Sequence, residues 1–157
     1  MKKRTMHRGK TSDGKFVYGT FIKLKGYQKG RSKYCIIPAD YRDTSRCKEP
    51  IKPIQVLQSS VSESTGQFDK YKREIYENDW LILKPTKDIT YYAKVYWNAK
   101  LGCWGLKGYA PSYVFLTAPI SNIATIVPEE DIPTIKAIAK SEADKFRKYN
   151  TIKETEI

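Results

Sequence analysis

The chain has 157 residues, of which 40% are apolar and 29% charged, a balance typical of a folded globular protein. No window reaches the roughly 18 apolar residues that a membrane helix needs. The basic first residues lack the apolar core of a signal peptide, so we predict a cytoplasmic protein with no membrane partner. Three cysteines, an odd number with no close pair, argue against a disulfide framework or a structural zinc site.

The net charge of +12 is concentrated towards the N-terminus. Eleven Lys or Arg residues lie in residues 1–33, against Asp13 alone. Such a block attracts polyanions, nucleic acid first, although an ordinary solvated surface with a basic terminus has the same composition. The candidate phosphate contacts in this block are Lys2, Lys3, Arg4, Arg8 and Lys10.

The first half of the chain has the alternation and the turn residues of short strands. In residues 15–25, Phe16 and Tyr18 fall on one face and Val17 on the other, after a turn that Gly14 permits. Pro38 ends a second strand because it cannot donate to a sheet. We predict strands at 15–25, 33–38 and 54–58, a long surface loop at 39–53 and a polar turn at 59–65.

The second half also predicts strands, joined by tight turns. Residues 91–97 alternate cleanly, and Asn98 to Gly102 form a hairpin connection in which Gly102 supplies the left-handed position. The predicted elements are a polar turn from Gly66, a short extended arm before Asn78, strands at 80–83, 91–97, 103–109 and 113–116, and a last strand or buried connector at 120–127.

A helix is predicted from Pro128 onwards, with a polar tail at 151–157. Acidic residues occupy its first turn and basic residues its last, which suits the helix dipole. Apolar residues at helical spacing form one stripe, made of Ile132, Ile135, Ile138, Ala139, Ala143 and Phe146. We expect this stripe to pack on the chain's own strands, with a partner subunit as the alternative.

Two stretches carry a resemblance to a known family. Gly66-Gln67-Phe68 and the run from Glu74 to Leu81 resemble the signature of the YopX proteins of phages and prophages, and Phe16 to Gly19 matches a second motif. The resemblance covers roughly residues 6–110 and implies an edge strand at the start of the chain. The family has no established activity to carry over.

The resemblance also implies an architecture. We expect a mainly β fold, with an N-terminal antiparallel sheet, a small Src-homology-3-like barrel and one C-terminal α-helix. The three expected parts are residues 1–66 with the basic arm, residues 67–127 as the barrel, and residues 128–157 as helix and tail. Asn78 stands where the family usually has glycine, which predicts a left-handed backbone there. The signature positions Gly66, Gln67, Glu74, Ile75, Tyr76 and Asp79 are carried over as architectural only.

Catalytic chemistry has few candidates in this sequence. His7 is the single histidine and lies in the basic terminus, so a histidine-based triad is not expected. Glu74, Glu77 and Asp79 lie close together and could bind a metal or act as acid and base, but turn N–H groups and nearby cations give them a structural alternative. We therefore expect no enzyme, no catalytic residue, no cofactor and no metal.

Interleaved aromatic and basic residues give the strongest functional pattern. Tyr92, Lys94 and Tyr96 share one face of a predicted strand, with Lys100 and Lys107 beside it on the next, as expected of a surface that stacks bases and neutralises phosphates. Cross-strand tyrosines also stabilise exposed sheets without any ligand. Nucleic-acid binding is the first functional hypothesis. The alternative is a protein-interaction module that engages a host factor or self-associates through the C-terminal helix.

Overall fold

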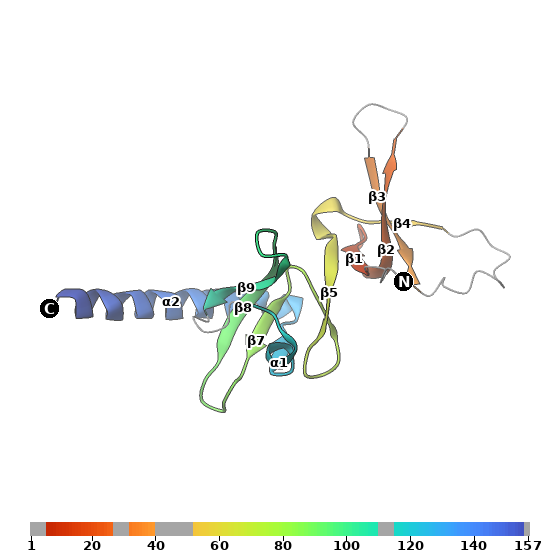
Figure 1. Cartoon of the computed structure of the whole chain (residues 1–157). Coiled ribbons are helices and arrows are strands. Elements are labelled where there is room, and N and C mark those ends of the chain that lie inside the picture. The colour runs from red at the N-terminus through yellow and green to blue at the C-terminus, as the bar shows by residue number, and fades with distance from the viewer. Residues whose placement is uncertain (1–5, 27–31, 40–51, 110–114, 156–157) are drawn as a thin grey trace. The chain divides into compact units, whose positions relative to one another are not determined.

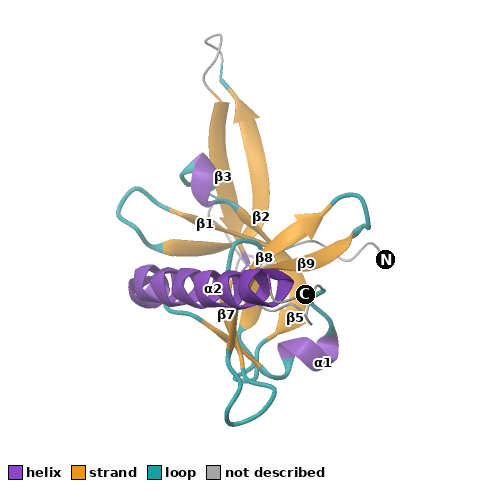
Figure 2. Ribbon diagram, turned by 90° about the vertical axis from the view of Figure 1, so that its left-hand side faces the viewer, coloured by secondary structure: helices purple, strands orange, loops and turns teal. Residues whose placement is uncertain are grey.

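The computed structural model describes residues 6–26, 32–39, 52–109 and 115–155 (Figure 1). The chain divides into two compact units, unit 1 at Met1–Ser64 and unit 2 at Thr65–Ile157. Among the described residues, both units are built mainly from antiparallel strands, and a long helix lies at the C-terminal end (Figure 2). The predicted mainly β class with a C-terminal helix is therefore confirmed.

Unit 1 is an antiparallel sheet with the strand order β4-β3-β2-β1-β5. Its elements are β1 (His7–Lys10), β2 (Phe16–Lys25), β3 (Ser32–Pro38), β4 (Ile54–Gln55), a 3-10 helix η2 (Gln58–Ser60) and the first residues of β5 (Ser62–Phe68). The predicted strands at 15–25 and 33–38 are confirmed, and Gly14 takes the expected positive φ of 84°. The predicted strand at 54–58 is shorter, since only two of its residues join the sheet.

The first strand lies inside the sheet of unit 1, and the edge position implied by the resemblance is wrong. Arg8 pairs with Tyr18 of β2 on one side and with Ser62 of β5 on the other. Gly9 permits close packing, because a Cβ atom there would come within 3.0 Å of Val56 and 3.1 Å of Ile36. Both Val56 and Ile36 are buried, so this end of β1 lies over the core of unit 1.

The segment predicted as a polar turn at 59–65 contains a strand instead. After η2, β5 begins at Ser62 and runs on to Phe68. Its serines and threonine have turn propensity, but its backbone pairs with β1, which lies more than fifty residues earlier in the sequence. Tertiary pairing overrides local propensity here, as is common for strands.

Unit 2 continues from the end of β5, which neighbours β6, and then forms a four-stranded antiparallel sheet in the order β10-β7-β8-β9. Its further elements are β6 (Glu74–Tyr76), β7 (Trp80–Leu83), β8 (Tyr91–Asn98), β9 (Cys103–Tyr109), α1 (Ala118–Ser121), β10 (Ala124–Ile126), a 3-10 helix η3 (Glu129–Asp131) and α2 (Ile132–Thr155). The predicted hairpin between β8 and β9 is confirmed, and Gly102 has the expected left-handed φ of 63°.

The sheet of unit 2 is open, so the predicted closed barrel is not formed by the described residues. β10 lies at one edge and β9 at the other. The segment at 120–127 divides into the end of α1 and the edge strand β10. Of the predicted strand at 113–116, Phe115 makes a single bridge with Gly105, and residues 113 and 114 lie outside the described residues.

A buried cluster holds unit 2 together on the inner face of this sheet. Ile75 of β6 joins the sheet residues in this cluster, so β6 packs against the inner face of the sheet. The fully or nearly buried members are Ile75, Leu81, Leu83, Ala93, Val95, Leu106, Leu116 and Ala124. Burial of these aliphatic side chains contributes roughly 1.5–3 kcal/mol each for the larger ones.

Helix α2 packs on its own unit through its first turns. It contacts β9 and β8, and its buried residues Ile135 and Ala139 are spaced one turn apart (Figure 2). Ile138, which the sequence placed on the same stripe, is 37% exposed. The side chains of Ala143 and Phe146 are not among those that the structure describes. α2 runs on to Thr155, past residue 151, where the polar tail was predicted to begin. Among the described residues, no helix combines the length and the apolar character needed to cross a membrane.

Candidate functional site

The outer face of the sheet in unit 2 carries a cross-strand row of aromatic and basic residues. Leu81 and Leu83 of β7 point into the core, so the alternation along the strand turns Trp80 to the opposite face. Trp80 lies opposite Lys94 of β8, and Lys94 lies opposite Lys107 of β9. One residue from each of three neighbouring strands therefore contributes to a single row.

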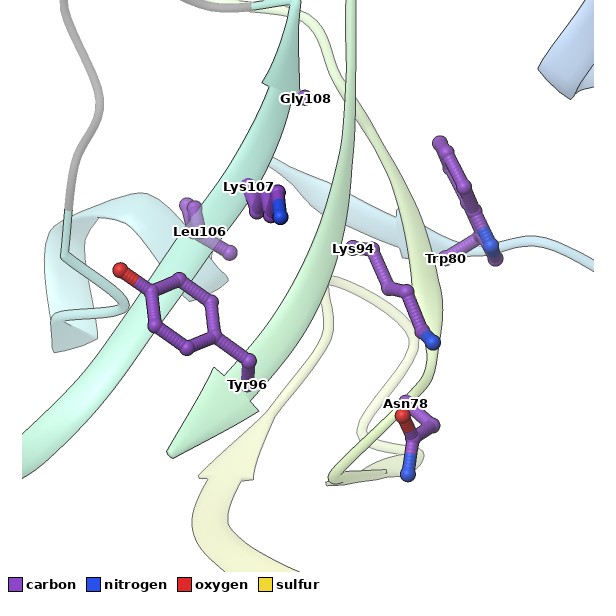
Figure 3. A pocket seen from close by; sticks show the side chains of 7 residues that line it. All are labelled: Asn78, Trp80, Lys94, Tyr96, Leu106, Lys107 and Gly108. Atoms are coloured by element: carbon purple, nitrogen blue, oxygen red, sulfur yellow. The ribbon is translucent and has the colours of Figure 1, made fainter. Parts of the chain in front are cut away.

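This row borders an open pocket of about 950 Å³ (Figure 3). Trp80, Lys94 and Tyr96 are half-buried and Lys107 is exposed, so none of these four residues is fully buried. The pocket is lined by Asn78, Trp80, Lys94, Tyr96, Leu106, Lys107 and Gly108. It brings together three of the residues selected from the sequence, namely Lys94, Tyr96 and Lys107.

Gly105 positions the ring of Tyr96. The two residues are paired in register across β8 and β9. A Cβ atom on Gly105 would lie 2.6 Å from Cε1 and Cζ of Tyr96 and 2.9 Å from its hydroxyl oxygen, so the ring lies directly across the glycine. Figure 3 shows the ring extending from β8 towards β9 with its face in view. The missing side chain is what allows the tyrosine to lie on the sheet.

We expect Gly105→Ala to displace the Tyr96 ring while lowering the free energy of unfolding by less than about 1 kcal/mol, because a flexible side chain can move aside. Gly108→Ala is the matched control. A Cβ atom there would lie 2.4 Å from the carbonyl oxygen of Tyr92, which is backbone, so a loss of about 1–3 kcal/mol is expected. Chemical unfolding and tyrosine NMR shifts measure both effects. Equal losses of stability in the two variants would contradict this role of Gly105.

Two residues selected from the sequence lie away from the pocket. Tyr92 shares the outer face, but it is paired with Ile82 and Tyr109 in the next row and does not line the pocket. Lys100 is exposed at the tip of the hairpin between β8 and β9. Sequence reasoning omitted Trp80 and Asn78, although the alternation of Trp80 with Leu81 was a signal that could have found the tryptophan.

The basic residues selected near the N-terminus are only partly described. Lys2, Lys3 and Arg4 lie outside the described residues. Arg8 and Lys10 are half-buried on β1, where both approach the ring of Phe16. They belong to unit 1 and are not part of the pocket in unit 2.

Asp79 and Glu74, two of the three carboxylates selected from the sequence, are engaged in structural hydrogen bonds. Asp79 is buried, and its Oδ2 accepts a 2.8 Å bond from the backbone N–H of Tyr76, which closes the turn before β7. Asn78 within that turn has a φ of 69°, so the predicted left-handed backbone is confirmed. Glu74 accepts a 2.8 Å bond from the hydroxyl of Tyr76. Among the described residues, no three His, Cys, Asp or Glu side chains cluster as metal ligands would.

Asp69 is a second buried carboxylate, which sequence reasoning did not select. Its oxygens accept bonds from the backbone N–H groups of Tyr71, Arg73 and Ile126 and from Nε of Arg73. Burial disfavours its charged form, but the bonds from Arg73, Ile126 and Tyr71 outweigh burial and lower the pKa of Asp69 below its ordinary 3.8. The residue ties the hairpin of β5 and β6 to β10.

The fold and the signature positions together define a class of mainly β proteins with an antiparallel N-terminal unit and a second unit that begins with a β-hairpin. The family model described as YopX protein matches residues 8–126, and the chain belongs to the YopX family. A comparison with proteins of curated function found no match.

The signature residues have structural roles in this chain. Gly66 has a left-handed φ of 72°, Ile75 is fully buried in the core, and Asp79 closes the turn before β7. The hydroxyl of Ser121 donates a long bond of 3.5 Å to the side chain of Gln67. The family pattern therefore describes how unit 2 folds, while the pocket residues Lys94, Tyr96 and Lys107 lie outside the signature.

Proposed function

We propose that this protein is a non-enzymatic module that binds single-stranded nucleic acid on the outer face of the sheet in unit 2. The observation that carries the proposal is the pocket in which two aromatic side chains, Trp80 and Tyr96, lie beside two lysines, Lys94 and Lys107. The resemblance to phage and prophage proteins suggests that it acts in the cytoplasm of a bacterial host.

The chemistry of the pocket suits an unpaired strand. A base that is free of its complement can lie on an aromatic ring, and such stacking contributes roughly 1–3 kcal/mol per base. The ammonium groups of Lys94 and Lys107 can neutralise phosphates on either side of a stacked base. A duplex hides both faces of its bases, so the same surface gains only the phosphate contacts from it. The proposal therefore includes a preference for single strands.

The carboxylates support a binding role over a catalytic one. Asp79, Glu74 and Asp69 are all held by hydrogen bonds within the fold. None of them lines the pocket. A general acid or base has to reach a bound substrate, and these groups are committed to turns and hairpins.

Fluorescence anisotropy with a labelled 12-nucleotide single strand and a hairpin duplex of the same composition tests the proposal. We expect tighter binding of the single strand, with an affinity that falls as salt is raised from 50 to 200 mM because counterions are released. Absence of binding to either probe at low salt would contradict the proposal. Equal affinity for both probes would contradict the proposed contribution of base stacking to binding.

A protein-interaction module is the second candidate, and exposed apolar side chains favour it. Trp97 is 46% exposed and Leu101 61% exposed at the hairpin end of β8 and β9, and Ile138 of α2 is 37% exposed. Exposed apolar groups of this kind are found at contacts between proteins. Sedimentation velocity over a range of concentrations tests self-association, and nuclease-treated pull-down from host lysate tests a host factor.

A further inference from the structure

Unit 1 has a second surface of aromatic and basic residues, on one face of β1 and β2. The pairing of the strands places Lys10 opposite Phe16 and Arg8 opposite Tyr18. Residues two apart on a strand share a face, so all four side chains lie on the same side of the sheet. We name this surface, made of Arg8, Lys10, Phe16 and Tyr18, the β1–β2 face.

The two cations of the β1–β2 face both lie against the ring of Phe16. The guanidinium carbon of Arg8 and the ammonium nitrogen of Lys10 each lie 5.0 Å from the centre of the Phe16 ring. Cation–π contacts therefore hold two positive charges beside one ring. The charged atoms of Arg8 and Lys10 lie no further from each other than twice the distance of each from the ring centre. Tyr18, whose ring centre is 6.2 Å from that of Phe16, is 44% exposed and extends the surface.

The charge of the whole chain is concentrated in the same unit. Unit 1 has 15 Lys or Arg against 5 Asp or Glu, whereas unit 2 has 14 against 12. Unit 1 therefore carries +10 of the net +12. The long-range attraction for a polyanion arises mainly from unit 1, although the pocket with two aromatic rings and two lysines belongs to unit 2.

We infer that the β1–β2 face is a binding surface for the phosphate backbone of nucleic acid, and that the two units divide the work of binding. Cations already approach the ring of Phe16, so this face offers charge, and a stacked base would have to compete with Arg8 and Lys10 for the ring. Unit 1 then contacts phosphates whatever the sequence or strandedness, and unit 2 supplies the preference for unpaired bases. This inference rests on the proposed function.

The salt dependence of binding separates phosphate contacts from stacking. For a single strand, the slope of log affinity against log salt changes by about 0.7 for each phosphate contact. The double variant Arg8→Gln/Lys10→Gln is expected to reduce the slope of the full chain by about 1.4 and to weaken a 20-nucleotide dT strand and a duplex in similar proportion. The swap Arg8→Lys/Lys10→Arg keeps both charges and is expected to keep the slope.

A matched control lies on the opposite face of the same unit. Lys23 and Lys25 are exposed on β2. Both are an odd number of residues from Tyr18, so their side chains lie on the face of the sheet opposite Tyr18. The ammonium nitrogen of Lys23 lies 5.4 Å from the centre of the Tyr34 ring. Lys23→Gln/Lys25→Gln removes the same charge and is expected to change the slope by less than half as much. Thermal melting confirms that each variant is folded before binding is measured.

The possible outcomes distinguish this inference from the function on which it rests. If the wild-type chain binds neither probe, the proposed function fails. If the wild type binds but the two glutamine double variants lower the slope equally, or neither does, the β1–β2 face is not the phosphate surface and the inference is overturned. A slope change confined to Arg8→Gln/Lys10→Gln supports it.

Discussion

Replacing Asp69 with Ala is expected to lower the free energy of unfolding of unit 2 by about 3–5 kcal/mol. Asp69 is only 1% exposed, and its carboxylate accepts backbone N–H bonds of 2.9 Å from Tyr71, 3.0 Å from Arg73 and 3.2 Å from Ile126. Alanine leaves these donors without their acceptor. The side chain of Arg73 is 46% exposed and can be rehydrated, so most of the loss comes from the backbone groups.

Tryptophan fluorescence measures this loss in the correct unit, because all three tryptophans lie in unit 2. Urea unfolding of Asp69→Ala should show a lower midpoint with an unchanged slope. Asp88→Ala is the control, since Asp88 is exposed in the turn before β8 and its removal should change stability by no more than about 0.5 kcal/mol. Equal midpoints for the two variants would contradict the structural role of Asp69.

The pH dependence of stability gives an independent test of the same carboxylate. The pKa of Asp69 is lower in the folded state than the ordinary 3.8, so its charge stabilises the fold fully above about pH 4. This contribution is lost as the pH falls through the folded-state pKa. Asp69→Asn lacks the charge at every pH. The difference in unfolding free energy between wild type and Asp69→Asn should therefore be largest near pH 7 and shrink below pH 3.8. A difference that stays constant down to pH 2 would contradict the charged role.

The double variant Trp80→Ala/Tyr96→Ala is expected to weaken single-strand binding at least about 30-fold. Each ring that stacks a base contributes roughly 1–3 kcal/mol, and a loss of 2 kcal/mol corresponds to about that factor. Duplex affinity should change by less than threefold, because the lysines of the pocket remain. Anisotropy titrations with both probes at fixed salt measure the two effects.

Tyr71→Ala is the control for this variant. Tyr71 is 63% exposed in unit 2 but lies at the tip of the hairpin of β5 and β6 and does not line the pocket. Its replacement should leave single-strand affinity unchanged. If Tyr71→Ala weakens binding as much as the loss of Trp80 and Tyr96, the pocket is not the stacking surface. The fluorescence of Trp97 and Trp104 checks that the double variant is folded.

Local patterns predicted the parts of the fold that depend on short-range chemistry. The alternation in 91–97 correctly separated the buried residues Ala93 and Val95 from the outward-facing Lys94 and Tyr96. The left-handed position at Gly102 was also predicted from its residue type, and the one at Asn78 from the glycine that the family usually has there. Such features need only a few neighbouring residues to be recognised.

Features that depend on distant pairing could not be predicted in this way. β5 is polar and forms a strand because β1 pairs with it, and the bond from Ile126 to Asp69 spans 57 residues. Whether the sheet in unit 2 is open or closed likewise depends on which strands pair with each other. Strand lengths and turn residues do not determine this pairing. Only some of the residues that line the pocket were selected from the sequence. Lys94, Tyr96 and Lys107 followed from alternation, and the same alternation in β7 would have placed Trp80 on the face opposite Leu81.

The interior position of β1 constrains how unit 1 is assembled during synthesis. β1 leaves the ribosome before its partner β5, which follows more than fifty residues later, yet β1 becomes a central member of the sheet. Until residue 62 has emerged, one edge of β1 offers open hydrogen-bonding groups to any extended chain nearby. A nascent chain that stalls before this point therefore exposes an unpaired edge of β1 that can pair with other extended chains. Pairing with β5 covers this edge.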